Sequence, residues 1–509
     1  MNFTPIARLF FRNSGKRTDL WTGHSTEIQI AQLRWLLFKG ISTEFGRKHG
    51  FEEILKSPDP RRIYRECVQA DGYERFRHDV MRMTEGEPDI LWPGRCDNFA
   101  QSSGTSGGRS KYIPVTADSL RVNHFAGSSD VVAQYLRLYP DSRMFAGKGL
   151  ILGGSFDSAL HPSRRNVRIG DLSATLIDAI PAAANLFRVP DKRTALLSDW
   201  SVKLDRLAEA ALHADLTNIS GVPSWFLRVL LRAMEISGKD NLKEIWPNLE
   251  VFFHGGISFE PYRAEYDRIC PAGGMRYFET YNASEGFFAT QASRENDGML
   301  LLIDRGIFYE FLPLGADSGS ATLGVDEVTP GEVYEMIISS CNGLWRYRIG
   351  DTVEVVSVDP LKIRVAGRTH SYINAFGEEL MESNAEHAIA EASRLTGAHV
   401  RNYTAGPLYA HNGEKGCHQW LIEWEAAPSD IERFNRCLDE SLQKVNSDYA
   451  AKRAGDIFLG APQIITLPAD TFDRWLSAHG SRRLGGQRKI PRLHNNRAML
   501  DALLSLLPK

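Results

Sequence analysis

The order of helical and strand patterns along the chain is the feature that most restricts its fold. Before Gly298, amphipathic segments such as EIQIAQLRWLLFKGISTEFG and SWFLRVLLRAMEI alternate with short apolar runs such as KGLILGG, LEVFFHGG and MRYFETYNA. Helices that alternate with short apolar strands are typical of an α/β core. From Gly298 to about Val358 nearly every segment predicts a strand, with Gly, Pro and Asn between. We expect this stretch to form an antiparallel sheet or a small β-barrel within the same domain.

A second domain is predicted beyond Arg368, where the pattern starts again. NAEHAIAEASRL and SDIERFNRCLDESLQKVN predict helices, CHQWLIEWEA and DIFLGAPQIITL predict strands, and ADTFDRWLSAHG predicts a last helix that ends at Gly480. A chain of 509 residues is also too long for one ordinary hydrophobic core. We therefore predict an α/β protein with a large N-terminal domain over residues 1–368 and a smaller α+β domain over residues 369–509.

The composition argues against several classes of protein. With a net charge of −3, the chain has no global electrostatic preference for nucleic acid or for an acidic membrane. No apolar run approaches the roughly 18 residues that a membrane span needs. Basic residues from Arg8 to Arg17 interrupt the N-terminal apolar residues too soon for a secretory signal. The cysteines are scattered without a Cys-x-x-Cys pair, which favours neither a zinc site nor a disulfide framework. We expect a cytoplasmic protein with no nucleic-acid or membrane partner.

The stretch SSGTSGGRSKYIPVT, from Ser102 to Thr116, is rich in glycine and hydroxyl side chains and carries Arg109 and Lys111. It has neither the Gly-Lys-Ser/Thr ending of a Walker loop nor the Gly-x-Gly-x-x-Gly dinucleotide pattern. The run KYIPVT is β-branched and contains proline, which predicts a strand and not the start of a helix. A phosphate bound here would lie between two strands, on backbone amides, hydroxyls and the two cations. A plain surface loop is the alternative.

Three further stretches have compositions that core packing does not require. In FFHGGISFEPY, Gly255 and Gly256 allow close backbone approach at the end of an aromatic strand. In ETYNASEGFF, Tyr281 offers a ring for stacking and Glu285 a carboxylate for Mg²⁺ beside phosphate oxygens. In LWRYRIGDTVEV, a strand that ends in Ile-Gly-Asp would project Asp351 beyond the sheet edge, where its carboxylate could accept two ribose hydroxyls.

A last stretch, LGGQRKIPRLH, gathers Arg488, Lys489 and Arg492 close to the C-terminus. Taken singly, each of these stretches has an ordinary structural explanation. The alternatives are a tight turn, an exposed turn carboxylate, an Asx turn and a solvated run of charges. The order in which the stretches follow one another is far more specific than any one of them.

In this order the stretches resemble motifs of the adenylate-forming superfamily of acyl and aryl acid ligases and luciferases. The closer resemblance is to its auxin-responsive acyl acid–amido synthetases, the plant hormone-conjugating enzymes and their bacterial relatives. The stretches similar to motifs of that branch are SSGTSGGRSKYIP, GGISFEPY, YNASEG, LWRYRIGD and GQRKIPR, within about Asn98 to Arg492. The chain departs at Gly107-Gly108-Arg109, where plant members usually have Ala-Gly-Glu-Arg, and it is shorter than plant members.

The resemblance implies an enzyme that uses ATP and Mg²⁺ to convert a carboxylic acid into an acyl-adenylate. The acyl group would then pass to an amine, typically an amino acid. The resemblance also implies two catalytic residues: Glu285, which would hold Mg²⁺, and Lys489, which would reach the α-phosphate from the C-terminal domain. That domain would rotate about a hinge at residues 367–369 between the two steps.

Other residues are assigned to ATP by the same resemblance. They are Ser102, Ser103, Gly104, Thr105, Ser106, Lys111, Gly255, Gly256, Tyr281, Asn282, Ser284, Asp351 and Arg368. Among them, the serines and the threonine of the first loop would hold the β- and γ-phosphates. The Gly-Gly turn and Tyr281 would flank the adenine, Asp351 would accept the ribose hydroxyls, and Arg368 would lie near the ribose or a phosphate.

Two other functions stay open at this stage. A ligase of the same fold could pass the acyl group to coenzyme A, and a non-catalytic relative could only sense a nucleotide. The presence of Glu285, Asp351 and Lys489 together argues against a sensor, because a sensor needs no mobile lysine. The acyl pocket is expected from NHFAGSSD and SGVPSWFL. The sequence names neither the acid nor the amine, and the oligomeric state is unknown.

Overall fold

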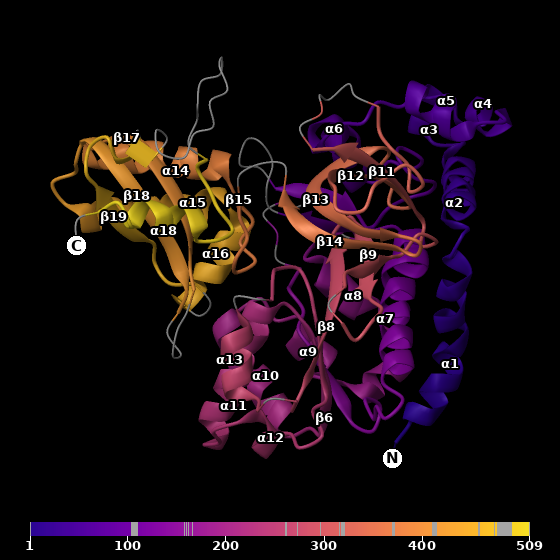
Figure 1. The fold of residues 1–509 in the computed structure, drawn as a ribbon, viewed down its shortest axis with the longest axis horizontal. Helices are drawn as coiled ribbons and strands as arrows, with labels where there is room; N and C mark the ends of the chain where they lie inside the picture. Colours follow the sequence, from indigo (N-terminus) through magenta and orange to yellow (C-terminus); the bar gives the residue numbers. More distant parts are fainter. Residues whose placement is uncertain are drawn as a thin grey trace. The chain divides into compact units, whose positions relative to one another are not determined.

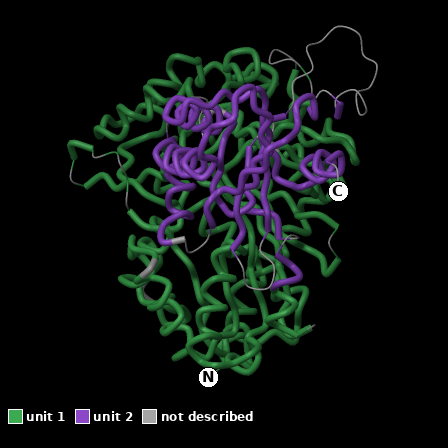
Figure 2. Tube along the Cα trace, turned by 90° about the vertical axis from the view of Figure 1, so that its left-hand side faces the viewer, with its two compact units in different colours: residues 1–102, 111–256, 266–369 green, residues 103–110, 257–265, 370–509 purple. Residues whose placement is uncertain are grey.

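The fold is described from a computed structural model (Figure 1). The structure describes residues 2–102, 110–156, 158, 160, 162–164, 166–259, 262–271, 273–295, 297–314, 316, 321–368, 372–409, 415–456, 459–472, 474–475 and 491–507. The chain divides into two compact units (Figure 2). Unit 1 comprises Met1–Ser102, Lys111–Gly256 and Tyr266–Thr369, and unit 2 comprises Ser103–Ser110, Ile257–Glu265 and His370–Lys509.

Helices of the first 270 residues include a long N-terminal pair and several short connecting helices. They are α1 (Thr4–Arg17), α2 (Ser25–Gly40), α3 (Glu44–Lys48), α4 (Phe51–Lys56), α5 (Pro60–Cys67), α6 (Tyr73–Thr84), α7 (Phe125–Leu138), α8 (Leu172–Ala179), α9 (Lys192–Ala195), α10 (Trp200–Leu212), α11 (Pro223–Ser237), α12 (Leu242–Ile245) and α13 (Arg263–Ile269). A π-helical turn over Ser119–His124 leads directly into α7.

Fourteen strands of unit 1 are described, in two sheets. They are β1 (Asn98–Ser102), β2 (Lys111–Pro114), β3 (Lys148–Ile151), β4 (Arg168–Gly170), β5 (Arg188–Val189), β6 (Leu216–Gly221), β7 (Val251–His254), β8 (Arg276–Ala283), β9 (Gly286–Gln291), β10 (Met299–Leu301), β11 (Ile307–Pro313), β12 (Val333–Ser340), β13 (Tyr347–Val358) and β14 (Leu361–Arg368). The smaller sheet has the order β2-β1-β4.

The larger sheet has eleven strands in the order β11-β12-β13-β14-β10-β9-β8-β7-β6-β3-β5. Strands β5, β3, β6, β7 and β8 pair in parallel and alternate with helices along the chain, which confirms the predicted α/β core. Strands β8 to β14 pair antiparallel. An antiparallel sheet was predicted for the stretch from Gly298 to about Val358, and β8 and β9 precede that stretch. The two halves share β8, so the antiparallel strands continue directly into the parallel ones and do not form a sheet of their own.

The segment EIQIAQLRWLLFKGISTEFG forms two helices where the sequence predicted one. The first, α2, ends at Gly40, and α3 begins after Thr43. The Thr43 hydroxyl donates to the carbonyl oxygen of Gly40 at 2.7 Å and accepts from the amide of Gly46 at 2.9 Å. A threonine that satisfies the end of one helix and caps the next provides the local reason for the break.

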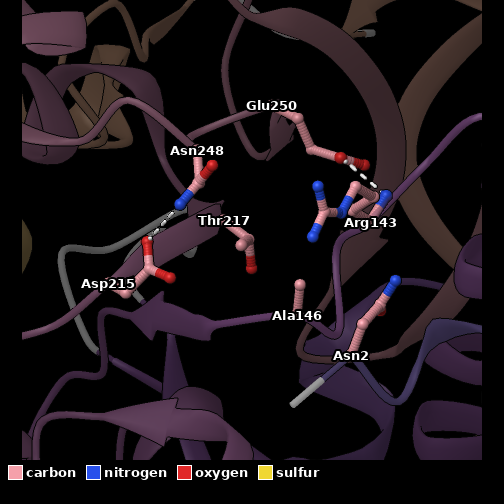
Figure 3. A pocket seen from close by; sticks show the side chains of 7 residues that line it. All are labelled: Asn2, Arg143, Ala146, Asp215, Thr217, Asn248 and Glu250. Carbon is pink, nitrogen blue, oxygen red and sulfur yellow. Dashed lines mark hydrogen bonds between the residues drawn. The ribbon is translucent and has the colours of Figure 1, made fainter.

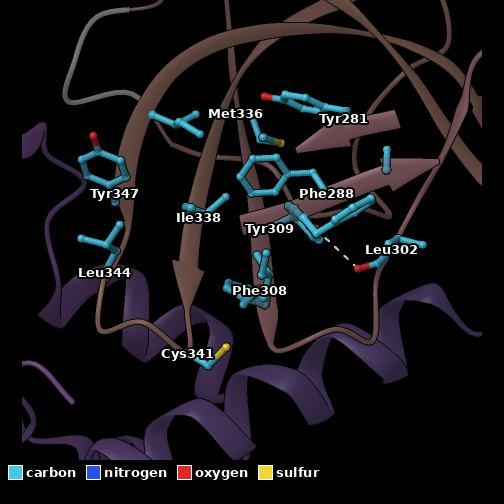
Figure 4. Packing of buried hydrophobic residues seen from close by; sticks show 14 of the residues in the cluster. Tyr281, Phe288, Leu302, Phe308, Tyr309, Met336, Ile338, Cys341, Leu344 and Tyr347 are labelled. Carbon is cyan, nitrogen blue, oxygen red and sulfur yellow. Dashed lines mark hydrogen bonds between the residues drawn. The ribbon is translucent and has the colours of Figure 1, made fainter. Parts of the chain in front are cut away.

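The antiparallel half surrounds a dense aromatic core (Figure 4). Tyr281 from β8, Phe288 from β9, Tyr309 from β11 and Tyr347 from β13 are all buried in this cluster. Tyr281 and Phe288 lie with ring centroids 4.9 Å apart. Because aromatic side chains bury large areas in fixed orientations, this cluster holds the strands that carry the predicted site residues in register.

A buried carboxylate joins helices α1 and α7 to the turn before β11. Asp130, on α7, is fully buried and accepts from Arg17 at 2.9 Å and from Arg305 at 2.6 and 2.7 Å. Arg17 also pairs with Asp304 at 2.8 Å. Burial raises the pKa of Asp304, because its charged form loses hydration.

Unit 2 contains a three-stranded sheet with helices beside it. Its described elements are β15 (Tyr372–Ile373), β16 (Leu380–Met381), α14 (Glu382–Thr396), β17 (His399–Leu408), β18 (Cys417–Ala426), α15 (Ile431–Val445), α16 (Ser447–Arg453), β19 (Gln463–Leu467) and α18 (Ala498–Leu504). β18 pairs antiparallel with β17 and parallel with β19. Asp430 caps α15 by accepting from the amide of Arg433, as its sequence predicted.

The prediction that ADTFDRWLSAHG forms the last helix was wrong, because α18 follows it. Met499, Leu500 and Leu503 of α18 are buried with Leu421 of β18. Only seven residues long, α18 is too short to give a distinct helical period in the sequence. In the part of the chain that the structure describes, no helix has the length and apolarity needed to cross a membrane.

We predict that Asp130→Ala lowers the free energy of unfolding by about 3–5 kcal/mol, because two arginines lose the buried carboxylate that they share. Denaturant unfolding followed by tryptophan fluorescence measures this loss. Glu52→Ala is the control, since Glu52 pairs with the exposed Lys56 on a helix surface. Its effect is expected to stay below about 0.5 kcal/mol. Equal losses in the two variants would contradict this account of Asp130.

Candidate functional site

The end of β8 is the structural centre of the candidate site. β8 is the last parallel strand and the first antiparallel one, pairing with β7 on one side and β9 on the other. Tyr281 and Asn282 are among the last three residues of β8, and Ser284 and Glu285 form the two-residue turn into β9. Ligands of α/β sheets bind at the carboxyl ends of the parallel strands, and all four residues lie at that end of β8.

Glu285 is buried although it occupies a turn, with 7% of its surface exposed. Its backbone carbonyl accepts from the side-chain amide of Asn342 at 3.0 Å. Its carboxylate lies 3.4 Å from the hydroxyl of Tyr347, which donates to it. The Lys111 ammonium donates to the same hydroxyl at 3.2 Å. Lys111, Tyr347 and Glu285 therefore form one connected chain of polar groups that joins β2, β13 and the β8–β9 turn.

Asp351 forms the second link between β8 and β13. The hydroxyl of Tyr281 donates to the Asp351 carboxylate at 2.6 Å. Across the β13–β14 pair, Asp351 stands opposite Arg368. The prediction that a strand ends at Asp351 was wrong, because β13 continues to Val358. The local distortion comes instead from Gly350, whose φ of +87° accompanies a shift in the β12–β13 register.

Tyr281 has its ring against Phe288 and its hydroxyl on Asp351, so it positions that carboxylate within unit 1. Its expected place beside an adenine remains a prediction. Asn282 stands opposite Phe287 in the β8–β9 pair, at a register shift that follows Tyr281. The predicted nucleotide residues of β8 are thus held by the shared strand and by its hairpin with β9.

Gly255 lies directly after β7, as the sequence predicted for the Gly-Gly pair. A methyl group at Gly255 would lie 2.4 Å from the carbonyl oxygen of Thr280 on β8. The Thr280 hydroxyl donates to the carbonyl of His254 at 3.0 Å. The backbone that comes close to Gly255 is therefore that of the neighbouring strand β8. Gly256 follows with a φ of +83°, a conformation that other residues rarely adopt.

The hydroxyl-rich stretch lies between two paired strands, as predicted. β1 and β2 are antiparallel, and Ser102 stands opposite Lys111 where the connection begins and ends. The predicted residues inside the connection, Ser103, Gly104, Thr105 and Ser106, lie outside the described residues.

Lys489 also lies outside the described residues, and for Arg368 only the backbone is described. The structure therefore brings together Lys111, Tyr281, Glu285 and Asp351, and their neighbours Asn282 and Ser284, from the predicted set.

Sequence reasoning assigned no role to Tyr347, and it expected Asn123, the first residue of NHFAGSSD, in the acyl pocket. Asn123, in the π-helical turn, accepts from the amide of Phe287 at 2.7 Å and donates to its carbonyl at 3.1 Å. This contact holds the start of β9 just after Glu285. The signal in the sequence for Tyr347 was its place in the stretch LWRYRIGD, four residues before Asp351.

A buried lysine, Lys203, and a half-buried carboxyl group, Glu279, lie near the same ends of the parallel strands. The Lys203 ammonium donates to the carbonyls of Gly153 at 2.5 Å, Leu197 at 3.0 Å and Gly154 at 3.1 Å. Burial lowers the pKa of Lys203 to about 8. Burial also raises the pKa of Glu279 on β8. Lys203 thereby fixes the loop that follows β3.

The position of Glu285 suits a magnesium site in which the ion is bound together with a phosphate-containing substrate. Among the described residues there is no cluster of three or more His, Cys, Asp or Glu that could hold a metal ion. Mg²⁺ commonly uses only one or two protein carboxylates and takes its other ligands from phosphates and water. A single buried carboxylate at a strand end satisfies that requirement.

A cavity of about 360 Å³ lies at the opposite, amino ends of the parallel strands (Figure 3). Its lining includes Thr217 at the start of β6 and Glu250 just before β7. The Glu250 carboxylate is occupied by the hydroxyl of Tyr135 and the amide of Arg143. None of the predicted site residues lines this cavity, so we do not assign the nucleotide to it.

We predict that Gly255→Ala lowers the free energy of unfolding by about 1–3 kcal/mol, because the new methyl group collides with the backbone of β8. Gly72→Ala is the matched control, since nothing lies within 4 Å of a methyl group there. Its effect is expected to be below about 0.5 kcal/mol. Thermal and denaturant unfolding of the two variants compare these costs, and an unperturbed Gly255→Ala protein would contradict the close approach of β7 and β8.

Known protein families match most of the chain. The GH3 family N-terminal domain matches residues 16–275, the GH3 family central domain residues 300–368, and the GH3 family C-terminal domain residues 383–498. Among curated proteins, indole-3-acetic acid-amido synthetase GH3.8 of Oryza sativa subsp. indica is 27% identical, over 93% of this chain and 89% of its own. Indole-3-acetic acid-amido synthetase GH3.4 of Arabidopsis thaliana is 22% identical, over 92% and 89%.

Solved structures share the fold at low sequence identity. The AtGH3.15 acyl acid amido synthetase in complex with 2,4-DB has a TM-score of 0.62 and 18% identity, covering 97% of this chain and 96% of that one. The 2-hydroxyisobutyryl-CoA ligase in its thioesterification state has a TM-score of 0.56 and 13% identity, covering 95% and 92%. The N-terminal domain match alone spans just over half of the residues. The chain belongs to the GH3 family, which confirms the resemblance that its motifs indicated.

Proposed function

We propose that this GH3 protein is an AMP-forming ligase that joins a carboxylic acid to an amine. In the first step, a carboxylate oxygen attacks the α-phosphorus of ATP, the bond from that phosphorus to the bridging oxygen breaks, and pyrophosphate leaves. In the second step, the amine nitrogen attacks the acyl carbon, AMP leaves with the bonding electrons, and the nitrogen releases a proton. The relatives named amido synthetases support an amide product, and we propose an amino acid as the amine.

The observation that best supports this function is the double link between the end of β8 and β13. Tyr281 meets Asp351 at 2.6 Å, and Glu285 is joined to Lys111 through Tyr347. Residues from three motifs far apart in the sequence thus come together at the carboxyl end of one strand. A nucleotide at that end would find a carboxylate for its ribose, a carboxylate for a metal ion and a cation for its phosphates.

Charge is the main obstacle in the first step, because a carboxylate must approach an anionic triphosphate. Cations and oriented donors that neutralise the developing charge lower such barriers. We propose that Lys111 and the hydroxyls and amides of residues 102–106 bind the phosphates. Glu285 would hold Mg²⁺, which when bound neutralises phosphate charge. Lys489 would reach the α-phosphate in the first step only, with a hinge at residues 367–369 moving it away before the amine attacks.

Asp351 is proposed to accept the ribose hydroxyls, and Tyr281 to hold its carboxylate in place. A carboxylate offers about four lone-pair positions, enough for a phenol and a diol together. Gly255 and Gly256 lie where a flat base could approach the backbone, and Arg368 stands across the sheet pair from Asp351. The use of ATP and the scattered cysteines are the grounds for a cytoplasmic location.

We predict that Lys489→Ala lowers carboxylate-dependent ATP–pyrophosphate exchange by at least about 100-fold, because the α-phosphate loses its cation in the transition state. Binding of ATP to the N-terminal domain is expected to survive, as measured by calorimetry. Lys444→Ala is the control, since Lys444 is exposed on α15. It is expected to retain exchange within about twofold of the wild type. Exchange near the wild-type rate in Lys489→Ala would refute the role of Lys489.

The acceptor is tested with the same enzyme and acid in two reactions. One contains the twenty amino acids and the other contains coenzyme A. We expect AMP release and an amide in the first, and no thioester in the second. A thioester without an amide would replace the proposed function by that of a coenzyme A ligase, whose fold the chain also resembles. Binding of ATP without AMP release for any carboxylic acid would favour a nucleotide sensor.

A further inference from the structure

We infer that Tyr347 is a positioning residue for the binding of magnesium-bound ATP. Its hydroxyl sets the positions of Lys111 and Glu285 relative to each other. The inference deepens the proposed function and rests on it. Tyr347 begins β13 and is fully buried, whereas Lys111 begins β2 and Glu285 belongs to the β8–β9 turn. Its phenol is thus the atom group that connects two charged residues from separate parts of the fold.

The contacts of the phenol suit this role. Its oxygen accepts from the Lys111 ammonium at 3.2 Å, and its hydrogen is donated toward the Glu285 carboxylate at 3.4 Å. The same ammonium lies 5.9 Å from the centroid of the Tyr347 ring. A neutral hydroxyl between a cation and an anion orients both without cancelling either charge. An ammonium carries three hydrogens and a carboxylate two oxygens, and these are the groups that phosphate and Mg²⁺ require.

The backbone before Tyr347 is held in an unusual conformation. Arg346 has a φ of +46°, which is strained for a residue with a side chain. Its amide donates to the hydroxyl of Ser339 at 2.9 Å, on β12. Such strain persists only where the surroundings fix it, and here the buried Arg346 side chain supplies that fixation.

The Arg346 guanidinium is bound on every side by unit 1. It pairs with Glu310 at 2.9 Å and donates to the carbonyls of Val68 at 2.6 Å and Arg65 at 3.0 Å. It also donates to the hydroxyl of Thr322 at 2.8 Å. These contacts tie the start of β13 to the end of α5 and to β11. The position of the Tyr347 hydroxyl is therefore set by a rigid frame and not by its own side chain alone.

Segment 71–76 completes the frame around Tyr347. The amide of Asp71 donates to the carbonyl of Arg346 at 3.2 Å, and the amide of Arg348 donates to the carbonyl of Asp71 at 2.9 Å. The rings of Phe76 and Tyr347 meet edge to face at 5.9 Å. Both the backbone and the ring of Tyr347 are thus fixed, so the phenol is preorganised before any ligand binds.

The test is Tyr347→Phe, which removes one hydroxyl and leaves the ring in place. Tyr309→Phe is the matched control, because Tyr309 is equally buried in the same cluster and its hydroxyl donates to the carbonyl of Leu302 at 3.5 Å, away from the charged groups of the site (Figure 4). Both variants are expected to melt within about 2 °C of each other without ligand. Calorimetry then measures the binding of Mg²⁺–ATP to each full-length protein.

We expect Tyr347→Phe to weaken Mg²⁺–ATP binding about tenfold, since the variant loses a hydrogen-bonded hydroxyl between two charges. In turnover the KM for Mg²⁺–ATP should rise by a similar factor, with the KM for the carboxylic acid changed less than about twofold. Tyr309→Phe should leave both values unchanged. Wild-type binding by Tyr347→Phe, or equal weakening in both variants, would overturn the inference.

The binding measurement separates this inference from the proposed function. If the wild type binds Mg²⁺–ATP but activates no acid, the proposed function fails, while weaker binding by Tyr347→Phe still upholds the role of Tyr347. If the wild type turns over and Tyr347→Phe behaves as the wild type does, only the inference fails. Absence of Mg²⁺–ATP binding in the wild type overturns both.

Discussion

The two-sided pairing of β8 is the constraint on which the rest of unit 1 depends. Parallel pairing with β7 brings the end of β8 to the edge where β6 and β7 also end. Antiparallel pairing with β9 forces a tight turn at that edge, and the turn carries Glu285. A strand with parallel neighbours on both sides would have left the edge by a longer crossover. The change of pairing at one strand therefore places a carboxylate where parallel sheets bind their ligands.

Phenols hold the charged groups at this edge. Tyr281 donates to Asp351 and Tyr347 connects Glu285 with Lys111, so each carboxylate has a neutral hydroxyl as a neighbour. Because these phenols are neutral and belong to the aromatic core, they orient the carboxylates without contributing a charge of their own. The same core that fixes the strands also fixes these hydroxyls, which joins the packing of unit 1 to its proposed chemistry.

The sequence predicted those structural features that depend on residues close together in the chain. The strand after the hydroxyl-rich loop, the Gly-Gly pair after β7 and the Asp430 cap all follow from residues within a few positions. Features that arise from tertiary contacts were missed. Gly350 allows β13 to continue past Asp351, and the position of Tyr347 depends on α5, β11 and β12 at once. The family was predictable because its motifs occur in a fixed order along the chain. Recognising that order does not require knowing how the motifs contact one another in the fold.

The central claim is that a carboxylate oxygen bonds to the α-phosphorus of ATP. Isotopic labelling tests it most directly: an acid that supports turnover is prepared with oxygen-18 in both carboxylate positions and incubated with enzyme, Mg²⁺, ATP and an amino acid. The account predicts that mass spectrometry finds one labelled oxygen in AMP and none in pyrophosphate. Label in inorganic phosphate, with ADP as the nucleotide product, would contradict it.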